Sequence, residues 1–552
     1  MADLTQKVVN RRQFLGGTLA AGSLAMLAGC GQKGDPAGAG GGEGGTFRFY
    51  INNPVCIEPY NLQESEGTQV GYQLFDSLTR YNFETSKVEP LACTSYEPND
   101  DATEFTFHLV EGAKFHDGTP VTSQSFKYGW ERMCNSETNP ETPSEISYHL
   151  SMVEGYNDEG NTTELTGVTC PDDLTLVVKL KYPFADFPIV CSHPALAPIP
   201  ECAKDDFMTF FLAPVGNGPF MIDGKWEDGQ YITLKRFDDY YGEPAKLEGV
   251  NFVIQKDLET GYREFEAGNL DYAEVPVAQI DAAKDKFGVS EDGYNPSEGK
   301  RVLLGQEPST YYLVCNTQAA PFNDPEVRKA ISLAINRDAI CETIFKGTRK
   351  SADSIIPPGI DGYEPGVWEY CAYDPERAEQ ILDAAGYTKD ANGSRGINFM
   401  LSYNNDGGHA EIMTSVIGDL EKIGITATSD TPEWAALLEK YSAGDFDCGR
   451  LGWVADYPIM DNFIYPLFYT GNGDNRSGYS NPEVDNLMME ARKINNDYDR
   501  RKAWQEINRL IGMDMPVIPL NFYCHSGVVS EQVKSFYLDP MKKVNLAEAE
   551  LA

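Results

Sequence analysis

The amino-acid sequence predicts a multi-lobed α/β protein. Segments with alternating apolar residues, typical of strands, are interspersed with segments of helical periodicity, and they do not follow a regular βα repeat. Beyond the N-terminal region about 500 residues remain, enough for more than one domain. No internal repeat of fixed period is visible. These observations favour separate mixed lobes with chain crossovers between them.

Local patterns place the elements along the chain. Strands are predicted at Thr46–Ile51, Glu104–Leu109, Leu174–Leu180, Tyr231–Arg236, Val250–Gln255 and Tyr311–Asn316. Helices are predicted at Thr122–Met133, Pro325–Phe345, Pro375–Ala385, His409–Ile423, Trp434–Ser442, Pro482–Ile494 and Arg500–Met513. Asp324 before Pro325 is a helix N-cap signal, and Gly386 and Gly424 are typical helix stops.

The N-terminus has the features of an export signal. Arg11 and Arg12 precede an apolar run from Phe14 to Ala28, which is too short for a stable membrane span, and Gly29 and Cys30 follow it. The segment is similar to bacterial lipoprotein signals, and the arginine pair resembles a twin-arginine export signal. We therefore predict a cleaved signal peptide over residues 1–29, a lipidated Cys30, and a glycine-rich flexible tether over residues 30–45.

Composition excludes several classes of partner. The formal net charge of −39 argues against nucleic-acid binding and against adhesion to anionic lipid headgroups, because both need concentrated Lys and Arg. An acidic surface of this kind favours solubility. It leaves open a preference for cationic ligands.

No motif for catalysis or for metal binding is present. The twelve cysteines form no CxxC pair, and the six histidines include no HExxH spacing. We also find no GxSxG and no phosphate-binding loop, so we predict no enzyme activity, no cofactor and no metal. Without Cys30, an odd number of cysteines remains. At least one thiol is therefore free unless chains cross-link, and the sequence assigns no bridge.

An ordered series of short motifs resembles the extracytoplasmic solute-binding proteins of peptide ABC transporters, the oligopeptide- and dipeptide-binding family. The series is FHL (107–109), FHDGTPVT (115–122), Phe126, LTL (174–176), GNGPF (216–220), YY (240–241), NT (316–317), PFND (321–324), VRKA (327–330), AINR (334–337), PP (357–358) and AAGY (384–387). Physically, HDGTPVT is typical of a turn before a helix capped by Thr122, and GNGPF of a loop where glycine allows close approach. We assign both to the scaffold.

The resemblance implies a two-lobed periplasmic-binding-protein-like fold of type II, with three domains and hinge closure on a ligand. Domain I is expected to be discontinuous, and a second domain is inserted into it. The expected bounds are residues 46–76, 190–310 and 510–552 for domain I, 77–189 for domain II, and 311–509 for domain III.

One local segment carries the expected ligand site. RLGWVADY (450–457) resembles the family's GWxADY segment, whose aspartate pairs with the α-ammonium of a peptide, so Asp456 takes that role by resemblance. A buried ammonium needs a charged partner, and Trp453 offers a flat wall beside it. Taken without the family, the segment is more typical of a strand and turn with a core tryptophan.

The resemblance extends the site to further positions. Gly452 and Val454 belong to the same strand, and Trp434 falls where the family has another pocket tryptophan. Arg450 and His409 fall where the oligopeptide branch places cations that meet peptide C-termini of different lengths. Arg450 is the better carboxylate partner because a guanidinium binds a carboxylate through two hydrogen bonds. We expect the two residues to serve peptides of different length.

The sequence also departs from the branch pattern. The lysine that serves the shortest peptides aligns with Phe345, next to Lys346. The tyrosine expected near Glu145–Tyr148 has no clear counterpart. Ser309 and Val454 stand where some members have a disulfide.

The family resemblance and the lipoprotein-like signal together imply a substrate-binding lipoprotein of an ABC importer, which captures short peptides and delivers them to the permease. It is expected to be a monomer, anchored by lipid at the outer face of the cell membrane, with no nucleic-acid partner. An alternative within the fold is a binder of a nickel chelate, haem or another small solute. Rivals from other classes are an exported redox enzyme or hydrolase, and an adhesin or signalling receptor.

The predicted anchor can be tested directly. Cys30→Ser should release the mature protein from membranes or leave an uncleaved precursor, because two acyl chains hold a protein firmly and one does not. Detergent phase partition of the wild type and the variant measures this. Recovery of both proteins in the aqueous phase would show that the protein is simply secreted.

Overall fold

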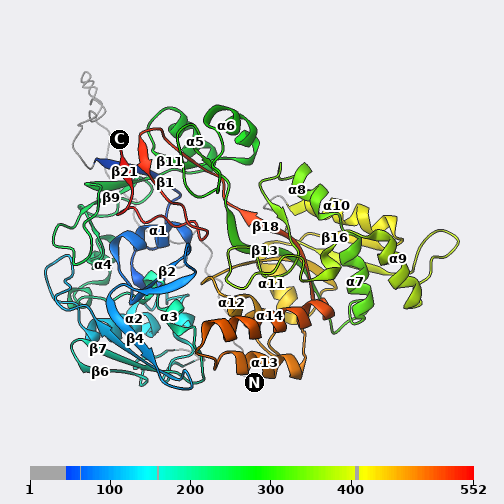
Figure 1. Cartoon of the computed structure of the whole chain (residues 1–552), viewed down its shortest axis with the longest axis horizontal. Helices are drawn as coiled ribbons and strands as arrows, with labels where there is room; N and C mark the ends of the chain where they lie inside the picture. Colours follow the sequence, from blue (N-terminus) through cyan, green and yellow to red (C-terminus); the bar gives the residue numbers. More distant parts are fainter. Residues whose placement is uncertain (1–44, 63, 158–160, 405–408) are drawn as a thin grey trace, which may run out of the picture. The chain divides into compact units, whose positions relative to one another are not determined.

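The computed structural model describes residues 45–62, 64–157, 161–404 and 409–552 (Figure 1). All of them belong to one compact unit. The predicted signal peptide, Cys30 and most of the tether lie outside the described residues. Within the described ranges no helix combines the length and the apolar character needed to cross a bilayer.

A seven-stranded sheet joins segments that are far apart in the sequence. Its order is β12 (Val302–Leu303), β19 (Gly527–Val529), β11 (Tyr272–Glu274), β1 (Thr46–Ile51), β10 (Gly249–Ile254), β9 (Tyr231–Arg236) and β8 (Phe220–Ile222). β1 runs parallel to β10, and the rings of Phe49 and Phe252 pack edge to face at 5.5 Å between centroids. The N-terminal, middle and C-terminal parts of the predicted domain I therefore contribute to one sheet.

A four-stranded antiparallel sheet lies within residues 77–189. Its order is β4 (Cys93–Pro98), β5 (Glu104–Leu109), β7 (Thr175–Lys179) and β6 (Val168–Asp172), and α2 (Ser123–Cys134) contacts β6. Along β5 the side chains of Phe105 and Phe107 are buried while their neighbours are more exposed, which is the alternation that predicted the strand.

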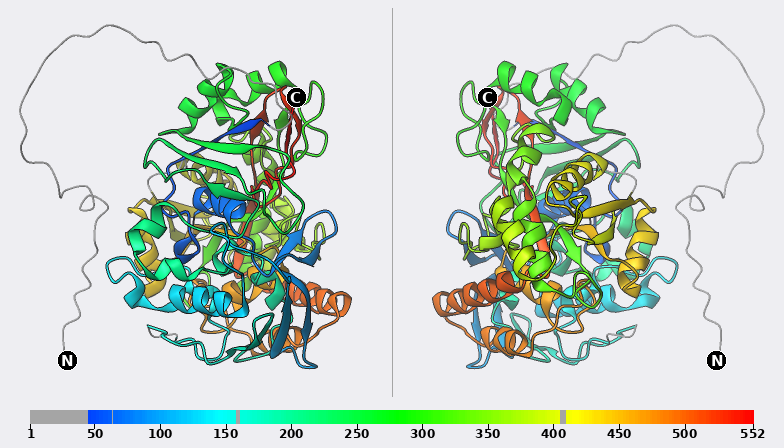
Figure 2. Two further views of the ribbon diagram at one scale, coloured as in Figure 1. Left: turned by 90° about the vertical axis from the view of Figure 1, so that its left-hand side faces the viewer. Right: turned by 90° about the vertical axis from the view of Figure 1, so that its right-hand side faces the viewer.

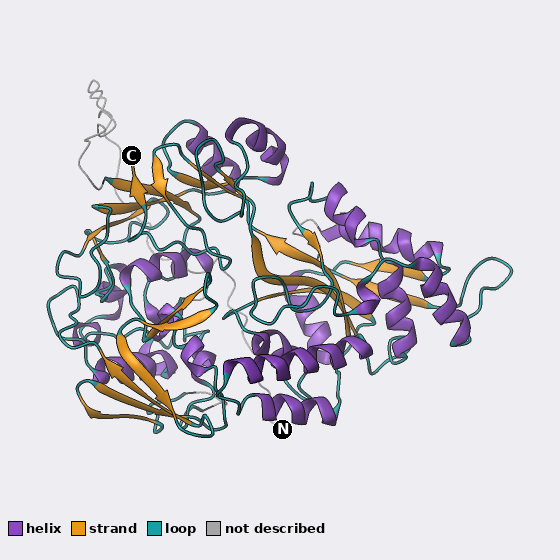
Figure 3. Ribbon diagram, viewed as in Figure 1, coloured by secondary structure: helices purple, strands orange, loops and turns teal. Residues whose placement is uncertain are grey.

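A six-stranded mixed sheet forms the centre of the C-terminal half (Figure 3). Its order is β14 (Lys350–Ser351), β18 (Val517–Cys524), β13 (Gln306–Cys315), β17 (Cys448–Val454), β15 (Asn398–Ser402) and β16 (Thr426–Asp430). β18 thus pairs with β13 inside this sheet, although the sequence division placed residues 510–552 in domain I.

The remaining strands form two small sheets, and helices connect the sheets. The paired strands are β2 (Thr79–Asn82) with β3 (Lys87–Pro90), and β20 (Val533–Ser535) with β21 (Glu550–Leu551). The helices are α1 (Ser65–Leu74), α3 (Phe187–Val190), α4 (Phe207–Leu212), α5 (Leu258–Glu266), α6 (Ile280–Phe287), α7 (Pro325–Ala334), α8 (Arg337–Thr343), α9 (Pro375–Ala384), α10 (His409–Lys422), α11 (Trp434–Ala443), α12 (Met460–Phe468), α13 (Pro482–Ala491) and α14 (Asp497–Asp514).

The helix predicted over Pro325–Phe345 is wrong as a single element. It divides into α7 and α8 because the Asn336 side chain accepts a hydrogen bond from the Ala339 N–H at 3.0 Å and so begins a new helix. The next residue, Arg337, is buried and donates to the Pro519 carbonyl of β18 at 2.7 Å. The two short helices are thereby fixed against the sheet.

Two helices near the C-terminus contact the segment that holds the four-stranded sheet. α13 and α14 lie side by side (Figures 1 and 2). The Arg500 guanidinium of α14 lies 2.8 Å from the Asp186 carboxylate, and both side chains are largely buried. The Ala185 N–H also donates to the Arg492 carbonyl at 3.0 Å. These contacts tie residues of the predicted domains II and III together.

The GNGPF loop approaches the backbone of another segment closely, as its glycines predicted. A Cβ on Gly216 would lie 1.9 Å from the Leu74 carbonyl oxygen, so no larger residue fits. The Asn217 side chain accepts from the Asp76 N–H and donates to the Asp76 carbonyl, each at 3.0 Å. Asn217 is fully buried, and it therefore satisfies both backbone groups of Asp76 where water cannot.

The HDG turn meets the same loop. The Gly216 N–H donates to His116 Nδ1 at 3.1 Å, so the other ring nitrogen, Nε2, carries the proton and donates to the Gly218 carbonyl at 3.1 Å. Burial lowers the pKa of His116 to about 4, which agrees with a neutral ring. The HDG turn and the GNGPF loop are thus joined by hydrogen bonds, as expected for parts of the scaffold.

The hydrogen bonds between the Asn217 side chain and the Asp76 backbone predict a large loss of stability when Asn217 is truncated. Asn217→Ala should lower the free energy of unfolding by about 3 kcal/mol, because two buried backbone groups of Asp76 lose their partners. Urea unfolding measures the change. The exposed Asn398→Ala is the matched control and should change stability by less than about 0.5 kcal/mol; equal effects of the two variants would contradict the assigned role of Asn217.

Candidate functional site

The strand β17 has one open edge at the predicted site. On one side it pairs antiparallel with β13 along its whole length, from Ser309 opposite Val454 to Cys315 opposite Cys448. On the other side β15 reaches only Cys448 and Gly449. Among the strands that the structure describes, none covers this second edge further along β17.

The backbone groups at the open edge follow from strand geometry. The Ala455 N–H donates to the Pro308 carbonyl at 3.0 Å, so it points toward the β13 side. Because N–H and C=O directions alternate along a strand, those of Gly452 and Val454 point the opposite way. The Arg450 carbonyl has the same parity, and it accepts from the Tyr441 hydroxyl at 3.1 Å on that side. Gly452 and Val454 therefore present donors and acceptors to an added strand.

Asp456 lies just beyond the end of β17, and its carboxylate is held in place. Asn462 of α12 donates from Nδ2 to Asp456 Oδ2 at 3.0 Å, and its Oδ1 accepts from the Asp456 N–H at 3.1 Å and from Trp453 Nε1 at 3.2 Å. Asn462 is 1% exposed and therefore rigid. Across the described ranges no Lys, Arg or His nitrogen lies within 4.0 Å of the Asp456 carboxylate, so its charge remains available to a cation.

Tyr148 reaches the same carboxylate from a different part of the chain. Its hydroxyl donates to Asp456 Oδ1 at 3.1 Å, although the two residues are 308 positions apart. Burial and then the Asp456 charge raise the pKa of Tyr148, so the hydroxyl stays a donor. The Tyr148 ring packs against His149, which stacks on His193. Tyr148 thus stands where the resemblance expected a tyrosine that the sequence did not assign.

Arg450 and His409 form one cluster. An Arg450 Nη hydrogen donates to His409 Nε2, and His409 Nδ1 donates to the Tyr311 hydroxyl at 3.0 Å. The Arg450 guanidinium carbon lies 5.1 Å from the Trp434 ring centroid and 5.6 Å from that of Tyr311. No carboxylate of the described chain lies within 4.0 Å of this guanidinium. The Arg450 guanidinium therefore brings a positive charge to this end of β17.

This contact changes the expectation that Arg450 and His409 serve peptides of different length. Separate roles require the two cations to meet carboxylates at different depths, one residue of extended peptide being about 3.3 Å. The structure instead bonds the two side chains to each other. This contact favours one shared carboxylate position over two separate ones.

The structure shows where the residues that depart from the branch pattern lie. Lys346 lies 3.1 Å from Asp281, so this lysine is paired elsewhere. Ser309 and Val454 are directly opposed across β13 and β17, at the position where some members have a disulfide. All cysteines in the described ranges are free thiols.

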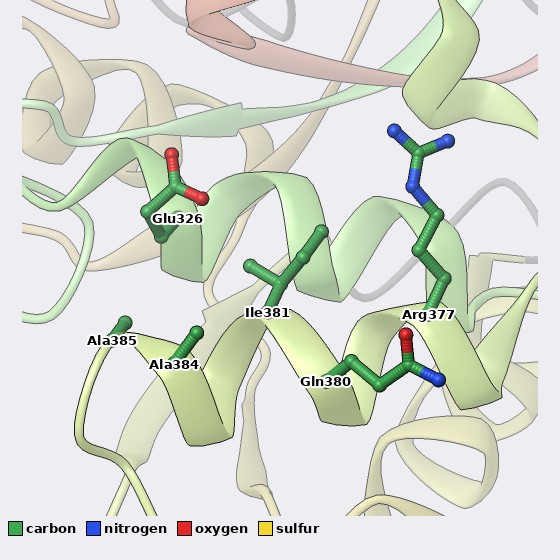
Figure 4. Close-up of a pocket in the computed structure, with 6 residues that line it drawn as sticks. All are labelled: Glu326, Arg377, Gln380, Ile381, Ala384 and Ala385. Atoms are coloured by element: carbon green, nitrogen blue, oxygen red, sulfur yellow. The ribbon is translucent and has the colours of Figure 1, made fainter.

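One hollow in the protein surface lies apart from these residues. It measures about 430 Å³ and lies between α7 and α9 (Figure 4). Its lining residues are Glu326, Arg377, Gln380, Ile381, Ala384 and Ala385, and none of the predicted ligand residues is among them. In the described part of the chain, no group of three or more His, Cys, Asp or Glu side chains could hold a metal ion.

Sequence reasoning missed three residues of the site: Asn462, Tyr148 and Tyr311. Asn462 had a readable signal, because it is a polar residue in the otherwise apolar helical run Met460–Phe468 and directly follows another, Asp461. Asp461 is explained by its buried ion pair with Arg492, at 2.6 Å. Tyr148 and Tyr311 had no such signal, since their contacts depend on chain segments far away in sequence.

Comparison with known proteins identifies relatives over nearly the whole chain. The model of the bacterial extracellular solute-binding proteins, family 5 (middle), matches residues 87–475. The dipeptide-binding protein DppE of Bacillus subtilis is 27% identical over 515 residues, covering 91% of each chain. The periplasmic oligopeptide-binding protein OppA of Salmonella typhimurium is 27% identical, covering 88% of this chain and 89% of the relative. The heme-binding protein A of Haemophilus influenzae is also 27% identical, covering 85% of each chain.

Solved structures agree with the fold. OppA of Haemophilus influenzae, in complex with the peptide RPPGFSPFR, has a TM-score of 0.67 at 25% identity, covering 92% of this chain and 99% of that one. HbpA2 from Haemophilus parasuis has a TM-score of 0.80 at 21% identity, covering 92% of this chain and 99% of that one. The predicted fold class and the predicted family are both confirmed.

Proposed function

This chain belongs to the bacterial extracellular solute-binding proteins of family 5, and we propose that it captures short peptides for an ABC importer. One observation carries the proposal. An open strand edge at Gly452 and Val454 lies between an anionic end at Asp456 and a cationic end at Arg450. A peptide has the complementary features, since its backbone pairs with a strand edge and its two ends carry opposite charges.

The two ends are spaced for a short ligand. Asp456 and Arg450 are six positions apart on an extended chain, a separation of about 20 Å that the inward reach of both side chains shortens. An extended peptide of a few residues fits this space. We therefore propose peptides of about two to five residues as ligands.

Peptide side chains would meet apolar and aromatic surfaces at this edge. Trp434 is 40% exposed and Val454 is 61% exposed, although both are large apolar residues. Main-chain hydrogen bonds give affinity without selecting a side chain, and roomy hydrated surfaces accept many of them. A general peptide preference follows. Because the family consists of solute-binding proteins, we assign no catalysis to this site.

The cellular setting is part of the proposal. The family name places such proteins outside the cytoplasm. The lipoprotein-like signal, Cys30 and the glycine-rich tether support attachment to the outer face of the membrane, within reach of a permease. We propose a monomer that delivers its ligand to the transporter's membrane subunits.

A second candidate ligand is haem or another small solute. It rests on the name of the relative heme-binding protein A. Haem has no α-ammonium and would leave the charge of Asp456 without a partner. The paired anionic and cationic ends therefore favour peptides.

The ammonium anchor yields the first test. Asp456→Asn keeps the size of the side chain and removes its charge, so peptide binding should weaken by about 2–5 kcal/mol. N-acetylated peptides should bind the wild type poorly and should lose little more in the variant. Calorimetry with tri- and tetrapeptides measures both effects, with the exposed Asp205→Asn as control. Equal affinity of free and acetylated peptides for the wild type would contradict this role, and tight binding of free amino acids or metal chelates alone would contradict the peptide function.

The Arg450–His409 cluster yields the second test. Arg450→Ala and His409→Ala should weaken the same peptides, and the double variant should lose less than the sum of the single losses, because the two side chains act on one carboxylate. C-terminal amidation should abolish the difference between wild type and variants. A double-mutant cycle over peptides of two to five residues measures the coupling. Additive losses that fall on different peptide lengths would restore the length-sorting role.

A further inference from the structure

Arg349 packs on the sheet face that carries the Tyr523 and Tyr311 rings. It precedes β14, where Lys350 pairs with Phe522 and Ser351 with Asn521, so Arg349 comes next to Tyr523. Its guanidinium carbon lies 4.2 Å from the Tyr523 ring centroid and 4.1 Å from that of Phe345. One guanidinium N–H donates to Asn521 Oδ1 at 3.2 Å. The guanidinium is thus held in a fixed position between two aromatic rings.

In the part of the chain that the structure describes, no carboxylate lies within 4.0 Å of the Arg349 guanidinium. The chain carries 84 acidic residues and 45 Lys and Arg, so an arginine without a carboxylate needs a reason. Two other buried arginines without one, Arg328 and Arg337, donate instead to several backbone carbonyls. In the described ranges, Arg349 and Arg450 are the partly buried arginines with neither a carboxylate within 4.0 Å nor such carbonyls.

Arg349 faces a different point of β17 than Arg450 does. The Tyr523 hydroxyl lies against Gly452, because a Cβ placed on that glycine would come within 2.6 Å of it. Arg450 instead lies over Tyr311, whose ring centroid is 6.1 Å from that of Tyr523. Arg450 therefore lies over Tyr311, whereas Arg349 packs on the Tyr523 ring, whose hydroxyl reaches Gly452, two positions nearer to Asp456 along β17.

Glu307 is an acidic group that influences Arg349 without a contact between the two side chains. Glu307 lies on β13 and influences Arg349 electrostatically, but no contact within 4.0 Å joins them. Burial raises the pKa of Glu307, and Lys542 opposes that rise more strongly than Arg349 does. Lys542 itself lies 3.4 Å from Glu274. Glu307 therefore belongs to a neighbouring group of charges around Lys542.

We propose that Arg349 is a second carboxylate-binding residue of the ligand site, resting on the proposed peptide function. It binds either the C-terminal carboxylate of a peptide too short to reach Arg450 or an acidic side chain inside a longer peptide. Both are the same chemistry, a carboxylate that accepts two parallel hydrogen bonds from a guanidinium. The rings of Phe345 and Tyr523 each cover one face of the Arg349 guanidinium, which excludes water there and fixes the position of the group.

The test compares Arg349→Met, Arg349→Lys and the control Arg263→Met, an exposed arginine of α5. Calorimetry uses alanine peptides of two to five residues, each with a free or an amidated C-terminus. It also uses pentapeptides with Glu or Gln at each interior position. If Arg349 binds the C-terminus, Arg349→Met weakens the shortest free-acid peptides at least about tenfold and leaves amidated peptides unchanged.

If Arg349 binds a side chain, the preference for Glu over Gln at one interior position falls by a similar factor. Arg349→Lys should restore part of either preference because it restores the charge, and it replaces Arg349→Met if that variant does not fold. Wild type that binds peptides, with Arg349 variants that match Arg263→Met on every peptide, overturns this inference alone. Wild type that binds no peptide overturns both this inference and the proposed function.

Discussion

The antiparallel pairing of β13 with β17 is the constraint on which the site depends. It occupies every second backbone group of β17, so the groups of Gly452 and Val454 are directed to the opposite side. It also places Ser309, Tyr311 and Gly452 on one sheet face. β15 leaves β17 after Gly449, and the remaining edge stays open. A different register, even by one residue, would turn Arg450 and Gly452 to the other face.

The polar side chains around this edge are fixed by residues that bind no ligand. Asn462 holds the Asp456 carboxylate, the Asp456 N–H and the Trp453 indole at once. The cationic end is fixed in a different way, by stacking on Trp434 and by the bond to His409. Positions fixed before the ligand arrives reduce the entropy lost on binding.

The sequence predicted much of the local structure and little of the long-range pairing. Thr46–Ile51, Glu104–Leu109 and Tyr231–Arg236 were predicted with the bounds that the structure has, because period-two patterns are local. The pairing of β1 with β10 joins residues about 200 positions apart, and no local pattern encodes it. The split between α7 and α8 was missed because the cap at Asn336 lies inside an otherwise continuous helical pattern.

The same division holds for the candidate site. Trp453 and Asp456 lie within one short segment, so a motif was sufficient to group them. The contact of His409 with Arg450 joins residues on a helix and a strand, and that of Tyr148 with Asp456 spans most of the chain. Asn462 required knowing that α12 turns back onto the end of β17. Side-chain contacts of this kind depend on tertiary packing, which residue spacing does not specify.

The open edge of β17 has a consequence for the empty protein. An unpaired strand edge is a template on which another chain can add a strand, and proteins commonly protect such edges with charge. Here Arg450 stands at one end and Asp456 lies just past the other, and among the described residues neither side chain has an oppositely charged partner within 4.0 Å. An internal strand of a second copy has no free ends to match these charges and would bury both of them unpaired. The residues proposed to read the ends of a ligand therefore also oppose self-association.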